Sequence, residues 1–235
     1  MTIPYFFISN YRQGDQEIIL DQENSRHVIQ VLRMKPGEAV RLTDGKGHLL
    51  QGTIAGDDKK RCLVAIGEET RLPAPGRDIA IGISLLKNSS RFEWFLEKAT
   101  EIGVARIFPL VCERTERQRF REERMKTILV SALLQSQQVW LPELGELRNY
   151  SEAVLSLSGD KKMIAHCMDA EKVSICSDLA GQGSSSLILI GPEGDFTDAE
   201  IKVALQHNFI PVSLGNTRLR SETAGVVAAA LLAFS

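Results

Sequence analysis

The residues best suited to chemistry lie close together near the end of this chain. Arg220 and Glu222 place a cation and a carboxylate two positions apart, directly before an apolar stretch that begins at Ala224. A cation can stabilise developing negative charge, and a carboxylate can accept a proton or orient a reactant. The pair indicates acid–base chemistry. The alternative is an ion pair that only closes the last helix.

Two glycine-containing loops lie beside this pair in the sequence. An apolar run at 187–190 ends in Gly191-Pro192-Glu193-Gly194, and a second run at 211–214 ends at Gly215. Each loop leads into a predicted helix. Ligands of an open α/β sheet bind outside the carboxyl ends of the strands, where such loops meet. The sequence therefore predicts a small-molecule pocket next to the cation and the carboxylate.

The spacing of other residues excludes several kinds of site. Neither loop has the Gly-Lys-Ser/Thr of a P-loop, and no Gly-x-Gly-x-x-Gly of a dinucleotide fold occurs. The four cysteines form no Cys-x-x-Cys pair and the four histidines have no metal-ligand spacing, so we predict no metal. We expect the cysteines to be small buried apolar residues. His166, at a predicted strand end, is a weaker candidate for the pocket.

Composition sets the class of protein. The chain has 235 residues, 43% of them hydrophobic and 25% charged, which is typical of a globular protein. The net charge of −2 means that a nucleic-acid partner would need a local basic patch. The first residues do not have the pattern of a signal peptide, and the apolar stretch at 224–234 is too short to span a bilayer. We therefore predict a cytoplasmic protein without a membrane anchor.

The first part of the chain, residues 1–72, is predicted to be a small β-barrel domain. Short β-type runs alternate with polar turns, and Asp44-Gly45-Lys46-Gly47 predicts a hairpin between 40–42 and 49–50. One helix is expected near 25–34, with Val28, Val31 and Leu32 at helical spacing. The proline- and glycine-rich segment at 72–76 predicts a linker. We place the domain boundary there.

The second domain, residues 73–235, is predicted to be α/β. Apolar strands alternate with amphipathic helices, as in a mostly parallel sheet covered on both faces. Gly103 is expected to end one helix, and Thr197 to Glu200 reads as a capping box that begins another. The strands are expected at 79–86, 104–111, 163–165, 187–190 and 211–214, and the helices at 92–102, 125–133 and 197–206.

Four segments carry a resemblance to a known family. They are Phe95 to Gly103 together with Glu113-Arg114, then Ile190 to Phe196, Leu214 to Ala224, and His27 to Glu38. In this order they resemble the RsmE-type uridine N3-methyltransferases of 16S ribosomal RNA, within the SPOUT (α/β-knot) superfamily. The resemblance implies a PUA-like RNA-binding β-barrel before a trefoil-knotted methyltransferase domain. It also implies a homodimer, S-adenosylmethionine as methyl donor, and the small ribosomal subunit as partner.

The resemblance also implies roles for individual residues. Arg220 is our first candidate for stabilising the uracil anion and Arg114 the second, while Glu222 is the first candidate for the base and Glu101 the second. Asp195 departs from the family, which usually has glycine there. The donor-binding residues are expected to be Leu189, Ile190, Gly191, Pro192, Glu193, Gly194, Leu214, Gly215, Leu219, Ser221, Thr223 and Ala224.

RNA capture requires local positive charge. Residues 106–126 contain seven basic and four acidic side chains, a surplus of three. Phosphate contacts from such residues give affinity without reading sequence; the alternative for each cluster is an ordinary solvated face. The expected RNA-binding residues are Arg26, Arg33, Lys35, Lys87, Arg117, Arg119 and Arg121.

Two rival functions remain open from the sequence. The donor loops do not by themselves decide the acceptor, so a ribose oxygen or another base is an alternative to uracil N3. A protein that binds RNA or assists ribosome assembly without catalysis is the other. The intact glycine loops argue against the second rival, because such a protein has no need of a donor pocket.

Overall fold

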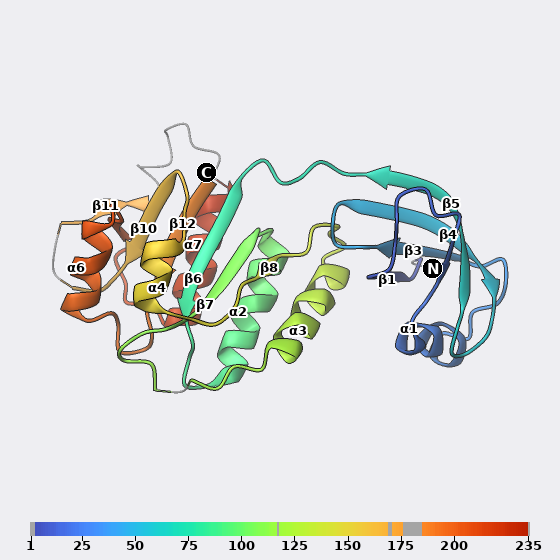
Figure 1. Ribbon diagram of the computed structural model, residues 1–235, viewed down its shortest axis with the longest axis horizontal. Helices are drawn as coiled ribbons and strands as arrows, with labels where there is room; N and C mark the ends of the chain where they lie inside the picture. The colour runs from blue at the N-terminus through green and yellow to red at the C-terminus, as the bar shows by residue number, and fades with distance from the viewer. Residues whose placement is uncertain (1–2, 117, 169–170, 176–184, 235) are drawn as a thin grey trace. The chain divides into compact units, whose positions relative to one another are not determined.

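The computed structural model describes residues 3–116, 118–168, 171–175 and 185–234. The chain forms two compact units (Figure 1). The first consists of Met1–Ala74 and Leu133–Leu141, and the second of Pro75–Ala132 and Pro142–Ser235. The first unit thus includes a segment from the middle of the chain.

A five-stranded sheet forms the first unit. Its order is β1 (Tyr5–Phe7), β3 (Ala39–Thr43), β4 (His48–Gly56), β5 (Leu63–Arg71) and β2 (Glu17–Ile19). Strands β1 and β3 are parallel and the other pairs antiparallel. The predicted hairpin at Asp44 to Gly47 is confirmed as the β3–β4 connection. Alternate residues of β4 point into the core, as expected for a sheet with one buried face.

The helix of this unit differs from the prediction. It consists of α1 (Gln22–Arg26), capped by Asp21, and a π-helical turn, η1 (His27–Val31). Val28 is fully buried, but Val31 is 67% exposed and Leu32 is 42% exposed. The predicted helix near 25–34 is thus present only in part, and the three side chains do not share a buried face, because a π-turn is wider than an α-turn and changes which side chains align.

The segment Leu133–Leu141 completes the first unit. The Tyr5 hydroxyl donates to the Gln138 carbonyl at 2.8 Å, and the Leu141 amide donates to the Gly45 carbonyl at 2.9 Å. The Trp140 ring lies against Gly47, where a Cβ atom would stand 2.4 Å from the ring. Gly47 also has a φ of 97°, so both space and backbone conformation require glycine there.

An eight-stranded sheet forms the centre of the second unit. Its order is β11-β13-β10-β12-β6-β7-β8, with β9 also paired to β7, and all of the pairs are parallel. The predicted α/β class is confirmed. The bounds are β6 (Asp78–Ser84), β7 (Arg106–Val111), β8 (Glu143–Leu144), β9 (Arg148–Asn149), β10 (Lys161–Ala165), β11 (Val173–Ser174), β12 (Ser185–Ile190) and β13 (Ile210–Ser213).

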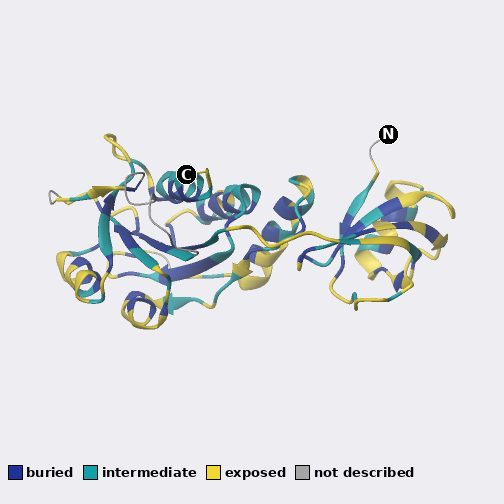
Figure 2. Cartoon of the chain, turned by 90° about the horizontal axis from the view of Figure 1, so that it is seen from above, coloured by how far each residue is buried: buried dark blue, intermediate teal, exposed yellow. Residues whose placement is uncertain are grey.

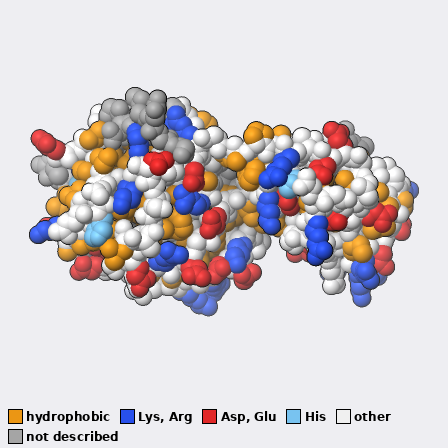
Figure 3. All heavy atoms as spheres, turned by 45° about the horizontal axis from the view of Figure 1, so that its top comes forward, with side chains coloured by type: hydrophobic (Ala, Val, Ile, Leu, Met, Phe, Trp, Pro, Cys, Tyr) orange, Lys and Arg blue, Asp and Glu red, His pale blue; other side chains and the backbone are white. Residues whose placement is uncertain are grey.

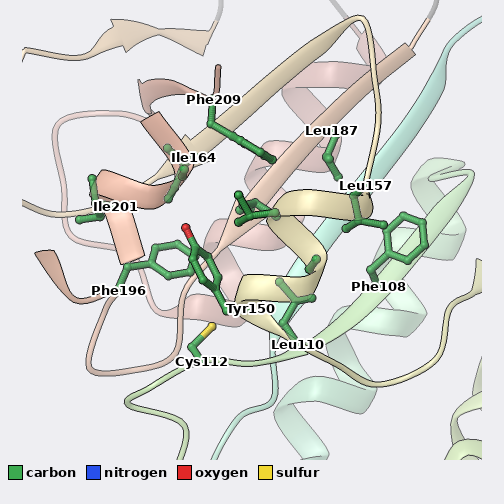
Figure 4. Close-up of a cluster of buried hydrophobic side chains, with 14 of the residues drawn as sticks. Phe108, Leu110, Cys112, Tyr150, Leu157, Ile164, Leu187, Phe196, Ile201 and Phe209 are labelled. Carbon is green, nitrogen blue, oxygen red and sulfur yellow. The ribbon is translucent and has the colours of Figure 1, made fainter. Parts of the chain in front are cut away.

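Helices cover both faces of this sheet, with their buried sides turned toward it (Figure 2). One face carries α4 (Tyr150–Ser156) and α6 (Asp198–Gln206) over a cluster that includes Leu110, Leu187 and Phe196 (Figure 4). The helix α3 (Glu122–Gln135) runs from this unit into the first. The predicted αL residue Gly103 (φ 93°) and the capping box of α6 are both present.

The other face is covered by α2 (Ser89–Ile102) and α7 (Ser221–Phe234). Gly225 of α7 faces the fully buried Phe95 of α2, and a Cβ atom at Gly225 would stand 2.6 Å from the Phe95 ring. The two helices therefore pack at close range where the ring meets the glycine. Across the described residues, no helix is both long and apolar enough to cross a membrane.

Candidate active site

A hollow lies at the carboxyl ends of three neighbouring strands of the second unit. Strand β10 stands between β12 and β13, and all three are parallel, so the loops that follow them meet at one edge of the sheet. Two adjoining cavities of about 270 and 440 Å³ lie there. Both are lined by Ala165 at the end of β10 and Cys167 just after it, and by Leu219 and Ala224 from the second loop and α7. We call the two together the donor cavity.

The loop after β12 is held tightly. Phe196 is 1% exposed and packs against Tyr150 with ring centroids 5.2 Å apart, which anchors the end of the loop. A Cβ atom at Gly191 would stand 3.1 Å from the Phe196 amide nitrogen, which is a tight contact, so the start of the loop favours a glycine. The Arg114 guanidinium donates to the Gly194 carbonyl at 2.8 Å. The loop is therefore fixed from both sides before any ligand binds.

Asp195, the departure from the family's glycine, is well accommodated. Its φ is 63°, in the left-handed region that aspartate tolerates better than most residues. One carboxylate oxygen accepts from the Cys167 amide at 2.7 Å and the other from the Phe196 amide at 2.8 Å. The side chain neither crowds the loop nor faces only solvent. It ties this loop to the end of β10 and lines the donor cavity.

The loop after β13 leads into α7. Gly215 has a φ of 140°, a conformation that favours glycine. Ser221, the first residue of α7, lines the donor cavity, so the positive end of this helix faces the hollow. Arg218 and Arg220 line it as well, and the carboxylates of Glu193 and Asp195 lie on the opposite loop. The lining thus offers separate positive and negative regions.

Arg220 and Glu222 meet at a second hollow, a groove of about 280 Å³. We call it the α2–α7 groove; it is lined by Ser90, Arg91, Trp94, Arg220, Glu222 and Thr223. Arg220 lines both this groove and the donor cavity, which are therefore neighbours. Within the described residues, the ion pair of Glu222 is with Arg91, at 3.6 Å, and not with Arg220. Arg220 is exposed and faces the two hollows.

Both second-choice catalytic residues lie outside these cavities. Arg114 supports the loop after β12 through the Gly194 carbonyl. Glu101 lies near the end of α2 and pairs with Lys98 at 2.8 Å. Neither lines the donor cavity or the α2–α7 groove. The structure thus brings Arg220 and Glu222 together and keeps Arg114 and Glu101 apart from them.

Most of the predicted donor-binding residues line the donor cavity. Three do not: Leu189 is fully buried in the core, Gly194 packs against Arg114, and Thr223 lines the α2–α7 groove. The residues that line it are Ile190, Gly191, Pro192, Glu193, Leu214, Gly215, Leu219, Ser221 and Ala224. Sequence reasoning missed Ala165, Cys167, Lys172, Asp195, Val212, Ser213, Asn216, Thr217 and Arg218. The end of β10 was the available signal for the first two, since ligands gather at strand ends.

The cysteines only partly follow the prediction. Cys62 and Cys112 are buried, as expected, and burial raises the pKa of the Cys112 thiol to about 12. Cys167 is exposed and lines the donor cavity, so the expectation of a buried residue is wrong there. Its position at the carboxyl end of β10 is the reason. Cys176 lies outside the described residues.

His166 also lines the donor cavity and is buried, with its Nδ1 atom lacking a hydrogen-bond partner among the described residues. Burial, aided by the positive charge of Lys172, lowers the pKa of its imidazole below the usual 6.5, against the opposing effect of Asp195. The folded protein therefore favours the neutral ring. The neutral His166 ring therefore adds a pH-dependent part to the free energy of unfolding. This part is fully present above pH 6.5 and is lost as pH falls through the lower pKa of the folded state.

We accordingly expect His166→Asn to reduce the loss of stability in acid. The wild type should lose about 1.4 kcal/mol relative to the variant for each unit by which the folded pKa lies below the unfolded one. Urea unfolding of both proteins between pH 7.5 and 5 measures this difference. Parallel stability curves across that range would contradict a depressed pKa, since the other histidines are common to both proteins.

The expected RNA-binding residues are spread over both units. Arg26 ends α1, Arg33 follows η1 with a φ of 57°, and Lys35 lies in the next turn. In the second unit Lys87 pairs with Glu116 at 2.7 Å, while Arg119 and Arg121 are exposed before α3. Arg117 lies outside the described residues. On the face drawn in Figure 3, basic and acidic side chains are interspersed. RNA contacts on this face would thus be made by individual basic side chains and not by one continuous positive surface.

Comparison with known proteins places the chain in a family. A model of the RNA methyltransferase domain matches residues 73–233, and one of the RNA methyltransferase PUA domain matches residues 20–67. Ribosomal RNA small subunit methyltransferase E of Synechocystis sp. is 30% identical over 212 residues, covering 87% of this chain and 69% of the relative. This chain belongs to the RsmE-type RNA methyltransferase family.

Two solved structures of high similarity extend the comparison. A probable rRNA-methyltransferase from Porphyromonas gingivalis has 37% identity and a TM-score of 0.88, with 97% of this chain and 95% of that chain covered. Ribosomal RNA small subunit methyltransferase E from Neisseria gonorrhoeae, bound to S-adenosyl methionine, has 29% identity and a TM-score of 0.86. That match covers 97% of this chain and 96% of the Neisseria chain. The likeness to family members thus extends over both units.

Proposed function

We propose that this protein transfers a methyl group from S-adenosylmethionine to N3 of a uridine in 16S ribosomal RNA. The single observation that carries the proposal is that the donor cavity and the α2–α7 groove adjoin each other in a chain of the RsmE-type family. The donor cavity, built by two glycine loops, shares Arg220 with a groove that holds Glu222. A donor site and an acid–base pair are the two parts that methylation of an imide nitrogen requires.

The lining of the donor cavity suits S-adenosylmethionine. The donor carries a carboxylate, an ammonium and a sulfonium, together with an adenine ring. Arg218 and the start of α7 at Ser221 suit the carboxylate, and Glu193 and Asp195 suit the cations. Leu214 and Leu219 offer apolar contact for the ring. The complex of the Neisseria relative with S-adenosyl methionine supports this choice.

The chain's own residues supply the acid–base part of the reaction. Bound S-adenosylmethionine supplies an electrophilic methyl carbon on a sulfonium, so no metal is needed. In this proposal Glu222 accepts the N3 proton of uracil, and Arg220 stabilises the negative charge that develops on the uracil oxygens. The N3 lone pair forms the bond to the methyl carbon as the sulfur–carbon bond breaks and its electrons return to sulfur. The products are 3-methyluracil, S-adenosylhomocysteine and a proton on the carboxyl.

Further features of the family belong to the same proposal. The PUA-like first unit is assigned to RNA binding, with Arg26, Arg33 and Lys35 as its phosphate contacts, and the second unit to catalysis along a trefoil-knotted path. A homodimer is expected from the resemblance to the family. Sedimentation as a monomer at micromolar concentration would count against the dimer. The expected place of action is the cytoplasm, on the small ribosomal subunit.

A labelled methyl-transfer assay tests the proposal. Small ribosomal subunits that lack this modification are incubated with the protein and radiolabelled S-adenosylmethionine, and the digested nucleosides are identified by mass spectrometry. We expect 3-methyluridine. Another methylated nucleoside would keep the enzyme and reject the uracil assignment. Donor binding without any transfer would favour the rival interpretation of an RNA-binding protein without catalysis.

A further inference from the structure

The α2–α7 groove contains a buried polar group that has no partner. Glu222 is 6% exposed, yet its Oε2 atom is buried without a hydrogen bond. Its Oε1 atom lies 3.6 Å from Arg91 Nε, within ion-pair range but too far for a good hydrogen bond. A buried carboxylate oxygen without a donor is costly. The arrangement is therefore incomplete until a further N–H or O–H group is presented to this carboxyl.

The charged side chains in the groove are of the kinds that one nucleobase edge requires. They are the carboxylate of Glu222, which accepts hydrogen bonds, and the guanidinium groups of Arg91 and Arg220, which donate them. Uracil presents O2, N3–H and O4 along one edge, which is acceptor, donor and acceptor. Cytosine has an unprotonated N3 in the central place and would bring a lone pair against the carboxylate. The lining therefore favours uracil over cytosine.

The groove also offers a flat surface. Trp94 is 42% exposed although it is a large apolar side chain, and it lies one helical turn after Arg91 on α2. Exposed aromatic rings in nucleic-acid-binding proteins serve as platforms on which an unpaired base stacks. A ring beside a hydrogen-bonding trio provides both a face and an edge for one base.

We propose that the α2–α7 groove is the pocket for the acceptor uracil, with Trp94 stacking on the base and Arg91 and Glu222 recognising its imide edge. The inference rests on the proposed function and adds where the base lies and which residues select it. The groove adjoins the donor cavity at Arg220, so a base bound there lies next to the donor. Arg91 then binds a uracil oxygen while its ion pair with Glu222 keeps the two side chains side by side.

Steady-state methyl transfer to unmodified small subunits tests the pocket, with donor affinity measured separately by calorimetry. Trp94→Ala should lower kcat/KM for the subunit by about tenfold or more, since base stacking on an aromatic ring is strong, and should leave donor affinity unchanged. Trp94→Phe should restore most of the loss. Arg91→Ala should lower kcat/KM to a similar extent. Leu205→Ala removes an equally exposed apolar side chain (45%) from α6 and serves as the control.

The outcomes separate this inference from the proposed function. If the wild type forms 3-methyluridine while Trp94→Ala and Arg91→Ala keep its kcat/KM, the function stands and the pocket is wrong. If Trp94→Ala loses activity only because it sediments as a smaller species, the groove is a contact between protein copies and the inference is overturned. If the wild type itself forms no 3-methyluridine, the proposed function fails.

Discussion

Arg220→Ala is expected to bind S-adenosylmethionine almost normally and to lose methyl transfer by roughly 10²- to 10³-fold in kcat, the range seen when one group that stabilises developing charge is removed. The reason is the position of Arg220 between the donor cavity and the α2–α7 groove. The substitution leaves the rest of the donor lining in place, including Gly191, Leu214 and Leu219 of the two loops. The negative charge that forms on uracil, in contrast, would lose the cation that lies between the base and the donor, and Arg91 would remain as the other cation of the groove.

The measurement is single-turnover methyl transfer on unmodified small subunits, with donor affinity determined by calorimetry. Arg220→Lys should recover part of the rate, because the charge returns without the planar guanidinium. Arg148→Ala is a suitable control, since Arg148 bonds to Ser156 and lies outside both hollows. Unchanged turnover of Arg220→Ala at saturating substrate would remove Arg220 from catalysis. A large loss of donor affinity would instead assign it to donor binding.

Phe95→Ala is expected to destabilise the second unit by about 3–5 kcal/mol, the usual cost of truncating a fully buried phenylalanine. The ring is 0% exposed and fills the space that Gly225 leaves open between α2 and α7. The surroundings cannot collapse easily, because the opposite side of that space is helix backbone. The loss should also reduce activity near the unfolding midpoint, since both helices line the α2–α7 groove.

Equilibrium denaturation followed by circular dichroism measures this loss. Leu155→Ala is the matched control, because Leu155 on α4 is 68% exposed and its truncation should change stability by less than about 0.5 kcal/mol. Gly225→Ala is a complementary test from the other partner. Its added Cβ atom would meet the Phe95 ring, and overpacking of this kind costs about 1–3 kcal/mol. Equal stabilities for Phe95→Ala and Leu155→Ala would contradict the packing described for these helices.

The parts of the fold that follow a strict local pattern were predictable from sequence. The long apolar strands of the second unit, the capping box at Thr197 and the αL glycine at Gly103 each depend on a few neighbouring residues. The helix α4 and the two-residue strands were missed because short elements carry little periodic signal. The π-turn at His27–Val31 escaped for a different reason, since its wider turn mimics an ordinary helix pattern in sequence.

The candidate site was predictable where its residues are adjacent in sequence. Both glycine loops, Arg220 and Glu222 fall in the last segments of the chain, and a sheet with parallel strands brings such loops together. Arg91 and Trp94 come from a helix far earlier in the chain, so their place beside Glu222 depends on how α2 packs on α7. Asp195 looked like a departure only, because its bond to the Cys167 amide joins two distant loops.

The segment Leu133–Leu141 has a consequence for the order in which this protein is made. A domain at the start of a chain usually folds while the remainder is still being translated. Here the first unit needs Gln138, Trp140 and Leu141 for its bonds to Tyr5, Gly47 and Gly45. Those residues leave the ribosome only after the first strands of the second unit. A nascent chain that stops before this segment therefore lacks the contacts from Gln138, Trp140 and Leu141. The first unit can form these contacts only after residues 133–141 have been synthesised.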